Sequence, residues 1–127
     1  MTETISIIIP VYNEESTVIK ILKRINETRS SKMFYEVIVS DDGSTDNTIK
    51  LLEQNKELYK KLIISEKNMG KGHAVIKGIN AAEGKYIIIQ DADLEYDPID
   101  YDKIINPILS GNADVVYGSR FIGSDEK

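Results

Sequence analysis

Two aspartates, Asp91 and Asp93, follow an apolar segment of this 127-residue chain and are separated by one alanine. Carboxylates held this close repel one another unless a cation neutralises them, and hard oxygen ligands suit Mg²⁺ or Mn²⁺. The pair therefore indicates a divalent-metal site. The alternative is an ordinary loop in which one aspartate caps the following helix.

A second acidic pair, Asp41 and Asp42, precedes a Gly-Ser turn. The turn, and a helix N-cap at Thr45 or Asp46, need only one acid between them. A carboxylate at a strand end can also accept a hydrogen bond from a nucleobase N–H or a ribose hydroxyl. Both a structural and a ligand-binding role stay open for this pair.

A third segment, Gly70-Lys71-Gly72, resembles a phosphate-binding turn at the start of a helix. It is not a Walker A loop, because Ser65 stands where that motif needs glycine and Gly72 where it needs serine or threonine. The positive end of the helix and Lys71 can still meet an anion. A simple glycine-rich loop is the alternative.

Other side chains carry weaker signals. Tyr12 can stack on a base or pack into the core. His73 has no cysteine or serine partner for nucleophilic chemistry, so we interpret it as a surface or capping residue. Lys56, Lys60 and Lys61 are typical of a solvated face.

Short β-branched segments alternate with segments of helical periodicity along the whole chain. The pattern predicts strands at 5–11, 35–39, 61–64, 85–90 and 114–117, and helices at 15–29, 47–59, 72–82 and 99–109. Strands separated by helices form βαβ units, so we predict an α/β fold with a mostly parallel sheet and helices on both faces. The segments that carry the acidic pairs, Tyr12 and Lys71 then meet at the carboxyl edge of the sheet, where such folds bind ligands.

Composition narrows the function classes. The formal net charge is -5, cysteine is absent and there is one histidine. These counts exclude disulfides, thiolate chemistry and a histidine–cysteine zinc site, and they disfavour nucleic-acid binding. No apolar run approaches the ~20 residues of a transmembrane helix. We therefore expect one soluble cytoplasmic domain.

Together these segments resemble the nucleotide-sugar-binding part of inverting family 2 glycosyltransferases, which have the Rossmann-like GT-A fold. The matching stretches cover nearly the whole chain: IIIPVYNEE from residue 7, VIVSDDGSTDNT from 37, NMGKGHA from 68, YIIIQDADLEYDP from 86 and VVYGSRF from 115. Within the family, the third and fifth stretches look most like polyprenyl-phosphate mannosyl- and glucosyltransferases.

The resemblance implies a role for each matching residue. The nucleotide would be held by Pro10, Tyr12, Glu14, Asp42, Lys71 and Asp91. The divalent metal, Mg²⁺ or Mn²⁺, would be held by Asp91, Asp93 and Glu95, where Glu95 replaces the glutamine usual in that subgroup. Arg120 would face an acceptor phosphate, which suits a bidentate guanidinium.

The implied reaction is metal-dependent transfer of a sugar, with inversion, from a nucleotide-diphosphate sugar to a sugar, lipid-phosphate or polysaccharide acceptor. A lipid acceptor would place the protein at the inner face of a membrane. The family's usual general base lies downstream of D-x-D, and we find no convincing base in this sequence. We therefore expect residues 1–127 to form one donor-binding domain whose acceptor half is missing, with an exposed sheet edge that favours self-association.

Two other classes stay as alternatives. One is a nucleotide-sugar-binding module without turnover, truncated or dependent on a partner. The other is a receiver-type Mg²⁺-binding regulatory domain, which fits less well because its acids and lysine should follow other strands. A HAD-type phosphatase fails because its D-x-D lies on the first strand.

Overall fold

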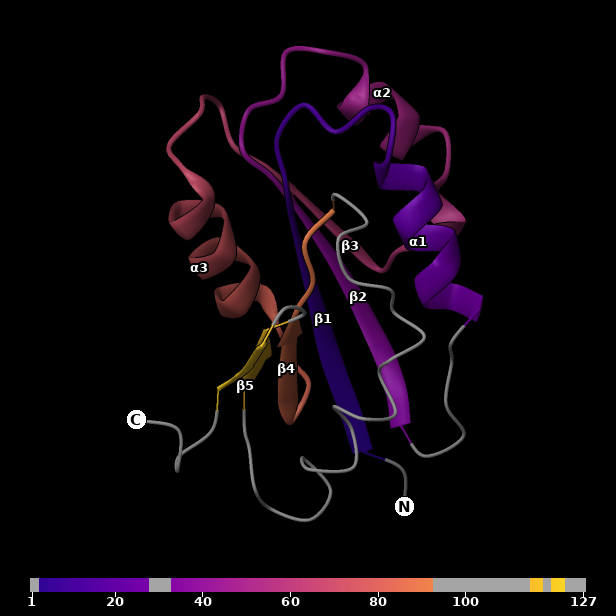
Figure 1. Cartoon of the computed structure of the whole chain (residues 1–127), viewed down its shortest axis with the longest axis vertical. Coiled ribbons are helices and arrows are strands. Elements are labelled where there is room, and N and C mark those ends of the chain that lie inside the picture. The colour runs from indigo at the N-terminus through magenta and orange to yellow at the C-terminus, as the bar shows by residue number, and fades with distance from the viewer. Residues whose placement is uncertain (1–2, 28–32, 93–114, 118–119, 123–127) are drawn as a thin grey trace.

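The structure, a computed structural model, describes residues 3–27, 33–92, 115–117 and 120–122. In these residues six strands form one sheet in the order β3-β2-β1-β4-β5-β6 (Figure 1). The strands are β1 (Glu3–Val11), β2 (Met33–Asp41), β3 (Lys61–Ile64), β4 (Tyr86–Ile89), β5 (Val115–Tyr117) and β6 (Arg120–Ile122). The helices are α1 (Val18–Glu27), α2 (Thr48–Glu53), the 3-10 turn η1 (Lys56–Leu58) and α3 (Lys71–Ala81).

The first five strands are parallel, and β6 returns antiparallel to β5. The prediction of an α/β fold with a mostly parallel sheet is confirmed, whereas β6 is a strand that the hydrophobic pattern did not predict. The order 3-2-1-4 is that of Rossmann-like sheets, while receiver domains have the order 2-1-3-4-5. The receiver-type alternative is therefore wrong, because the observed strand order differs from the order of that fold.

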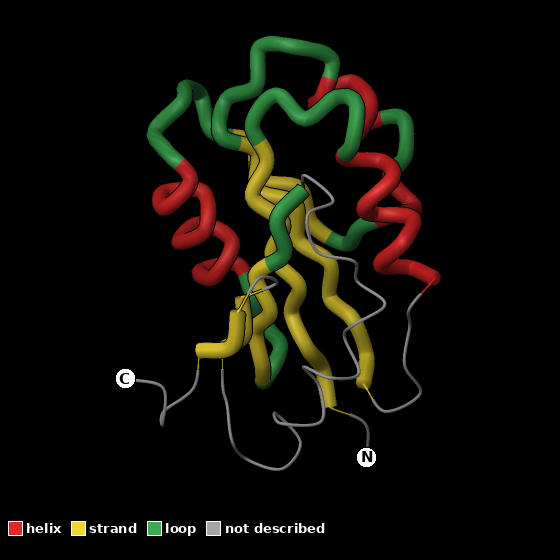
Figure 2. The backbone as a smooth tube through the Cα atoms, in the orientation of Figure 1, coloured by secondary structure: helices red, strands yellow, loops and turns green. Residues whose placement is uncertain are grey.

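The sheet is covered on both faces (Figures 1 and 2). Alternate side chains of a strand point to opposite faces, so β1 divides its apolar residues between two clusters. Ile5, Ile7, Ile9 and Val11 pack with α1 and α2, while Ile8 packs with α3. All four isoleucines have no exposed surface, which confirms that this strand is buried on both faces.

Helix α3 lies very close to the central strand. A Cβ atom placed on Gly78 would stand 2.5 Å from Cγ2 of Ile8, which is closer than real contacts permit. Glycine at this position therefore allows the helix backbone to approach β1.

Two helix predictions need correction. Helix α1 begins at Val18 rather than residue 15; residues 15–17 form a separate turn, in which the amides of Thr17 and Val18 donate to the Glu14 carbonyl. The helix predicted at 47–59 divides into α2 and η1. At the division the Asn55 side chain donates to the Leu51 carbonyl at 2.8 Å and so competes with the helical backbone.

The helix predicted at 99–109 lies outside the described residues. Among the described residues, none of the helices has the length and apolar character needed to cross a membrane. Strand β3 forms one edge of the described sheet, and Ile64 at its end is exposed. Self-association through a sheet edge stays a prediction.

At the amino ends of β3 and β4 a buried carboxylate is enclosed by polar partners. Glu36, 5% exposed, accepts from the Ser6 hydroxyl at 2.5 Å and from the Glu83 amide at 2.8 Å. Lys61 lies 3.3 Å from the same carboxylate and 3.4 Å from that of Glu83. The prediction that Lys61 belongs to a solvated face is therefore wrong, because a partner 25 residues earlier in the chain holds its ammonium group.

Hydrogen bonds decide the ionisation of this buried group. Burial raises the pKa of Glu36, but the bonds from Glu83, Ser6 and Lys61 outweigh it and hold that pKa below its ordinary value. The carboxylate is thus charged and paired in the folded protein.

Candidate functional site

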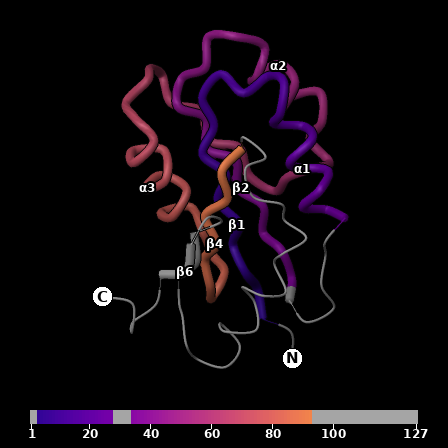
Figure 3. The backbone as a smooth tube through the Cα atoms, viewed as in Figure 1, coloured from indigo at the N-terminus to yellow at the C-terminus, as the bar shows by residue number. Residues whose placement is uncertain are grey.

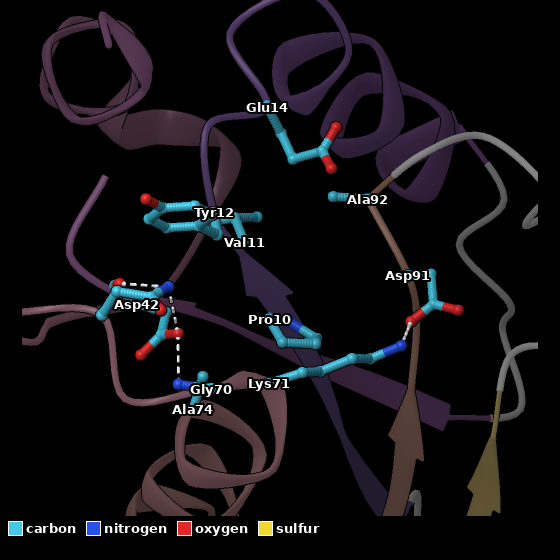
Figure 4. A pocket seen from close by; sticks show the side chains of 11 residues that line it. Pro10, Val11, Tyr12, Glu14, Asp42, Gly70, Lys71, Ala74, Asp91 and Ala92 are labelled. Carbon is cyan, nitrogen blue, oxygen red and sulfur yellow. Dashed lines mark hydrogen bonds and ion pairs between the residues drawn. The ribbon is translucent and has the colours of Figure 1, made fainter. Parts of the chain in front are cut away.

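A pocket of about 260 Å³ opens at the carboxyl ends of β1, β2 and β4, beside the first turn of α3 (Figure 4). The loops that surround it lie together at one end of the molecule (Figure 3). The pocket is lined by Pro10, Val11, Tyr12, Glu14, Asp42, Asn68, Gly70, Lys71, Ala74, Asp91 and Ala92. The structure thus brings together all six residues that the sequence assigned to nucleotide binding.

The loops that follow β1 and β2 are joined by hydrogen bonds. Asn13, in the left-handed region with φ of 52°, receives the Thr45 amide on its side-chain oxygen at 2.8 Å. The amide of Asn13 donates to the Ser44 hydroxyl at 2.8 Å, and that of Glu14 to the Thr48 hydroxyl at 2.9 Å. These cross-links fix the first wall of the pocket.

Asp46 strengthens the same junction. Its carboxylate accepts from the amide of Thr48 at 2.9 Å and from its hydroxyl at 2.6 Å, which is the pattern of an Asx turn just before α2. Burial raises the pKa of Asp46, but the hydrogen bonds from Thr48 and from the Glu15 amide lower it by more, so the net shift of the pKa is downward. The N-cap of α2 is Asn47, whose carbonyl accepts from the Leu51 amide and whose side chain makes no capping bond, so the prediction of an N-cap at Thr45 or Asp46 is wrong by one or two residues.

Asp42 joins the second loop to the third. It is 2% exposed, and its carboxylate accepts from the side-chain amide of Asn68 at 2.9 Å and from the backbone amides of Met69 at 2.9 Å and Gly70 at 2.8 Å. The bond from Gly70 is among those drawn in Figure 4. Asp42 therefore positions the turn that leads into α3, a structural role that the sequence left open.

The first acid of the pair serves the turn itself. Asp41 is fully buried and accepts from the amides of Gly43 and Ser44 and from the Ser44 hydroxyl. Gly43 has φ of 78°, and a Cβ there would lie 2.6 Å from the carbonyl carbon of Lys67. Only glycine suits both the conformation and the contact with the third loop.

Tyr12 lies in the pocket, with its ring on the same side as Asp42 (Figure 4). The side chain is 42% exposed, so core packing does not explain it. Glu14, also in the lining, accepts from the Thr17 hydroxyl at 2.9 Å. An aromatic face, a proline and two carboxylates therefore surround this half of the pocket.

Lys71 and Asp91 form the charged half of the pocket. The Lys71 side chain extends from the start of α3 toward Asp91, and its ammonium group pairs with the Asp91 carboxylate (Figure 4). The side chain of Lys71 is 52% exposed and that of Asp91 18% exposed. A cation is thus held on the carboxylate that the sequence assigned to a metal.

Asp93 and Glu95, the other two predicted metal ligands, lie outside the described residues. Within the described ranges, no three potential ligands cluster into a metal site. Asp91 fits a divalent ion as far as one residue can, because it is a hard oxygen donor in the pocket that already neutralises a positive charge. Arg120 begins β6, opposite Tyr117 in the register; its side chain is not among those described.

Sequence reasoning missed part of the lining. Asn68 stood in a loop that we considered important, but its bond to Asp42 depends on tertiary contact. His73 is half-buried rather than on the surface, and its Nδ1 atom has no hydrogen-bond partner among the described residues. It does not line the pocket.

Comparisons with known proteins agree with this architecture. The model of the family described as Glycosyl transferase family 2 matches residues 6–127. The chain is 36% identical over 120 residues to an undecaprenyl-phosphate 4-deoxy-4-formamido-L-arabinose transferase of Proteus mirabilis, covering 91% of this chain and 36% of that protein. It is 34% identical to a dolichol-phosphate mannosyltransferase of Pyrococcus furiosus, over 93% of this chain and 33% of that one.

A similar solved structure is the mannosyltransferase PcManGT of Pyrobaculum calidifontis in complex with GDP-Man and Mn²⁺. Its TM-score is 0.68 at 29% identity, over 79% of this chain and 30% of that chain. The chain spans between about a third and a half of the length of the first curated relatives it matches. Because the family match extends over nearly all of the sequence, the chain belongs to glycosyl transferase family 2, with the GT-A fold.

Proposed function

We propose that the pocket binds a nucleotide-diphosphate sugar, and that the chain is the donor-binding part of an enzyme that transfers the sugar to a polyprenyl phosphate with inversion. One observation carries this proposal. A single pocket combines an aromatic and carboxylate half, suited to a nucleoside, with a half in which Lys71 and Asp91 lie side by side. A diphosphate with its metal needs both an anion-binding and a cation-binding group.

The nucleoside is assigned to Pro10, Tyr12, Glu14 and Asp42. The exposed ring of Tyr12 offers a surface on which a base can stack. Asp42 already accepts three hydrogen bonds from residues 68–70, and a carboxylate has about four acceptor positions. At most one position is left for a base N–H or a ribose hydroxyl, so Asp42 acts on the nucleoside mainly by shaping the pocket.

The diphosphate is assigned to Lys71 and the N-terminal turn of α3, whose amide groups and dipole favour an anion. Asp91, together with Asp93 and Glu95, would hold Mg²⁺ or Mn²⁺. When bound, such an ion neutralises charge on the leaving diphosphate and so makes it a better leaving group. The Mn²⁺ complex of PcManGT supports a divalent ion in this family without deciding between the two.

The acceptor is assigned by its chemistry and by the relatives. An oxygen of the acceptor phosphate attacks the anomeric carbon from the face opposite the diphosphate, and an ionised phosphate needs no general base. Arg120 is proposed to face this phosphate. The names of the Proteus and Pyrococcus relatives support a lipid phosphate, which would bring the protein to a membrane surface.

A nucleotide-sugar-binding module without turnover is the second candidate. The described lining of the pocket accounts for donor binding, and binding of a nucleotide sugar does not by itself require turnover. The two candidates share the donor site and differ in the reaction. Release of free or transferred sugar from a labelled donor separates them.

The donor site is tested by thermal unfolding of the chain with UDP, GDP, dTDP or CDP, each with and without Mn²⁺. A ligand at about a hundred times its dissociation constant adds roughly 2.7 kcal/mol to the stability, which is a readable shift of the midpoint. We expect a shift that is largest for one base and requires Mn²⁺. The Asp91→Asn variant is the matched control and should lose the metal-dependent part; no shift with any nucleotide would contradict the proposal.

A further inference from the structure

We propose that Lys71 is an exchangeable counter-ion of Asp91: it neutralises this carboxylate in the metal-free protein and turns to the donor diphosphate when a divalent ion takes the carboxylate. The inference rests on the proposed function for its second half, and on the Lys71–Asp91 pair for its first. Lys71 thus has two alternative partners, the Asp91 carboxylate without metal and the donor diphosphate with metal.

The first step is the pair itself. Asp91 lies two residues beyond Ile89, the last residue of β4, and its carboxylate contacts the Lys71 ammonium inside the pocket. Half of the Lys71 side chain is exposed, at 52%. An exposed lysine–carboxylate pair is weak and is screened by solvent, so a doubly charged hard cation can replace the ammonium group.

The second step is the pivot. Lys71 is the first residue of α3, and the residue before it, Gly70, donates its amide to the buried Asp42 carboxylate at 2.8 Å. The Ala74 amide donates to the Gly70 carbonyl at 3.2 Å. The backbone of Lys71 is therefore fixed, while its long stem can change rotamer without moving the helix.

The third step is the consequence for binding. Lys71 and a divalent ion compete for the same Asp91 carboxylate, so the lysine opposes metal binding in the absence of nucleotide. The displaced ammonium group stays in the pocket, beside the N-terminal turn of α3 where the diphosphate is proposed to bind. Removing the lysine should therefore strengthen the binding of metal alone and weaken the binding of the nucleotide.

The experiment titrates Mn²⁺ into the whole chain without nucleotide and measures free Mn²⁺ by electron paramagnetic resonance. Lys71→Met is compared with wild type, with Lys77→Met as control, since Lys77 is an exposed lysine of the same helix that does not line the pocket. Methionine keeps the helix propensity of lysine. Lys71→Arg tests whether a positive charge at this position restores the wild-type behaviour.

We expect Lys71→Met to bind Mn²⁺ roughly two- to fivefold more tightly than wild type, the range measured for exposed ion pairs. Lys77→Met and Lys71→Arg should not show this gain. With saturating Mn²⁺, Lys71→Met should bind whichever of UDP and GDP the wild type prefers at least tenfold more weakly, as for the loss of a charge-assisted hydrogen bond.

Unchanged or weaker Mn²⁺ affinity in Lys71→Met, or a gain of the same size in Lys77→Met, overturns the exchange. Failure of the wild type to bind Mn²⁺ overturns it as well. If Lys71→Met gains Mn²⁺ affinity but no protein binds UDP or GDP, the counter-ion role stands and the proposed nucleotide function fails. Mn²⁺ affinity thus tests the counter-ion exchange, and binding of UDP or GDP tests the proposed nucleotide function.

Discussion

Two lysine–carboxylate pairs lie at opposite edges of the same sheet and differ in how completely protein groups satisfy them. At the amino edge, Glu36 is paired with Lys61 and also receives Ser6 and the Glu83 amide. At the carboxyl edge, Asp91 has one partner among the described residues, Lys71.

The difference separates a structural pair from one that we propose to respond to ligand. The Glu36 side chain is 6% exposed and three protein groups already contact its carboxylate, so a group from solvent has little access to replace Lys61. The Asp91 side chain is three times as exposed, at 18%, and lies in a pocket. A carboxylate with one partner next to a cavity can change that partner.

The largest expected effect comes from breaking the Glu36–Lys61 pair. Glu36→Ala leaves the Ser6 hydroxyl and the Glu83 amide without their acceptor and removes the nearer carboxylate from Lys61, so the free energy of unfolding should fall by about 3 kcal/mol. Urea denaturation measures the change. Glu66→Ala, an exposed acid in the third loop, is the control and should stay within ~0.5 kcal/mol of wild type. Equal losses in both variants would remove the distinction.

The next effect concerns the link between the two pocket halves. Asp42→Ala removes the acceptor of three hydrogen bonds that hold residues 68–70, so stability should fall by about 2 kcal/mol. Because the turn before Lys71 is loosened, UDP and GDP should both bind more weakly, by similar factors. Calorimetric titration measures this; a loss confined to one nucleotide would instead assign Asp42 to base recognition.

A smaller effect is the loss, in acid, of the stability that the Glu36–Lys61 pair contributes. The pKa of Glu36 is held below its ordinary value of 4.5, so the folded chain binds this proton less readily than the unfolded chain. The stabilisation is complete above pH 4.5 and is lost as the pH falls through the folded pKa. The stability difference between wild type and Glu36→Gln should therefore be constant from pH 7 to 5 and shrink below 4.5, as measured by denaturation at each pH; a difference that stays constant into acid would contradict the assignment.

The smallest effect on stability is expected at the Lys71–Asp91 pair. Asp91→Asn removes one partly exposed ion pair, and the unfolding free energy should change by less than ~0.5 kcal/mol. The same substitution should abolish Mn²⁺-dependent binding of nucleotide, as measured by titration calorimetry. A large loss of stability would place Asp91 among the structural carboxylates with Glu36.

The amino-acid sequence by itself determined the alternation of strands and helices, the loops that carry chemistry and the family. Strand periodicity and a fully apolar β1 are local properties, so they could be predicted without contacts. Asp42, Lys71 and Asp91 could be nominated for the same reason, because parallel strands place their carboxyl ends at one edge whatever the loop details. Helix ends and the division at Asn55 were less predictable, since side chains there compete with the backbone.

Only the tertiary structure decided the partners. Glu36 and Lys61 are 25 positions apart, Asp42 and Gly70 are 28 apart, and Lys71 and Asp91 are 20 apart, so no local pattern connects them. The strand order 3-2-1-4 brings each pair together and excluded the receiver-type fold. Whether a charged residue becomes structural or ligand-responsive depends on how many donors surround it, and that number is fixed by chain packing rather than by the identity of the residue.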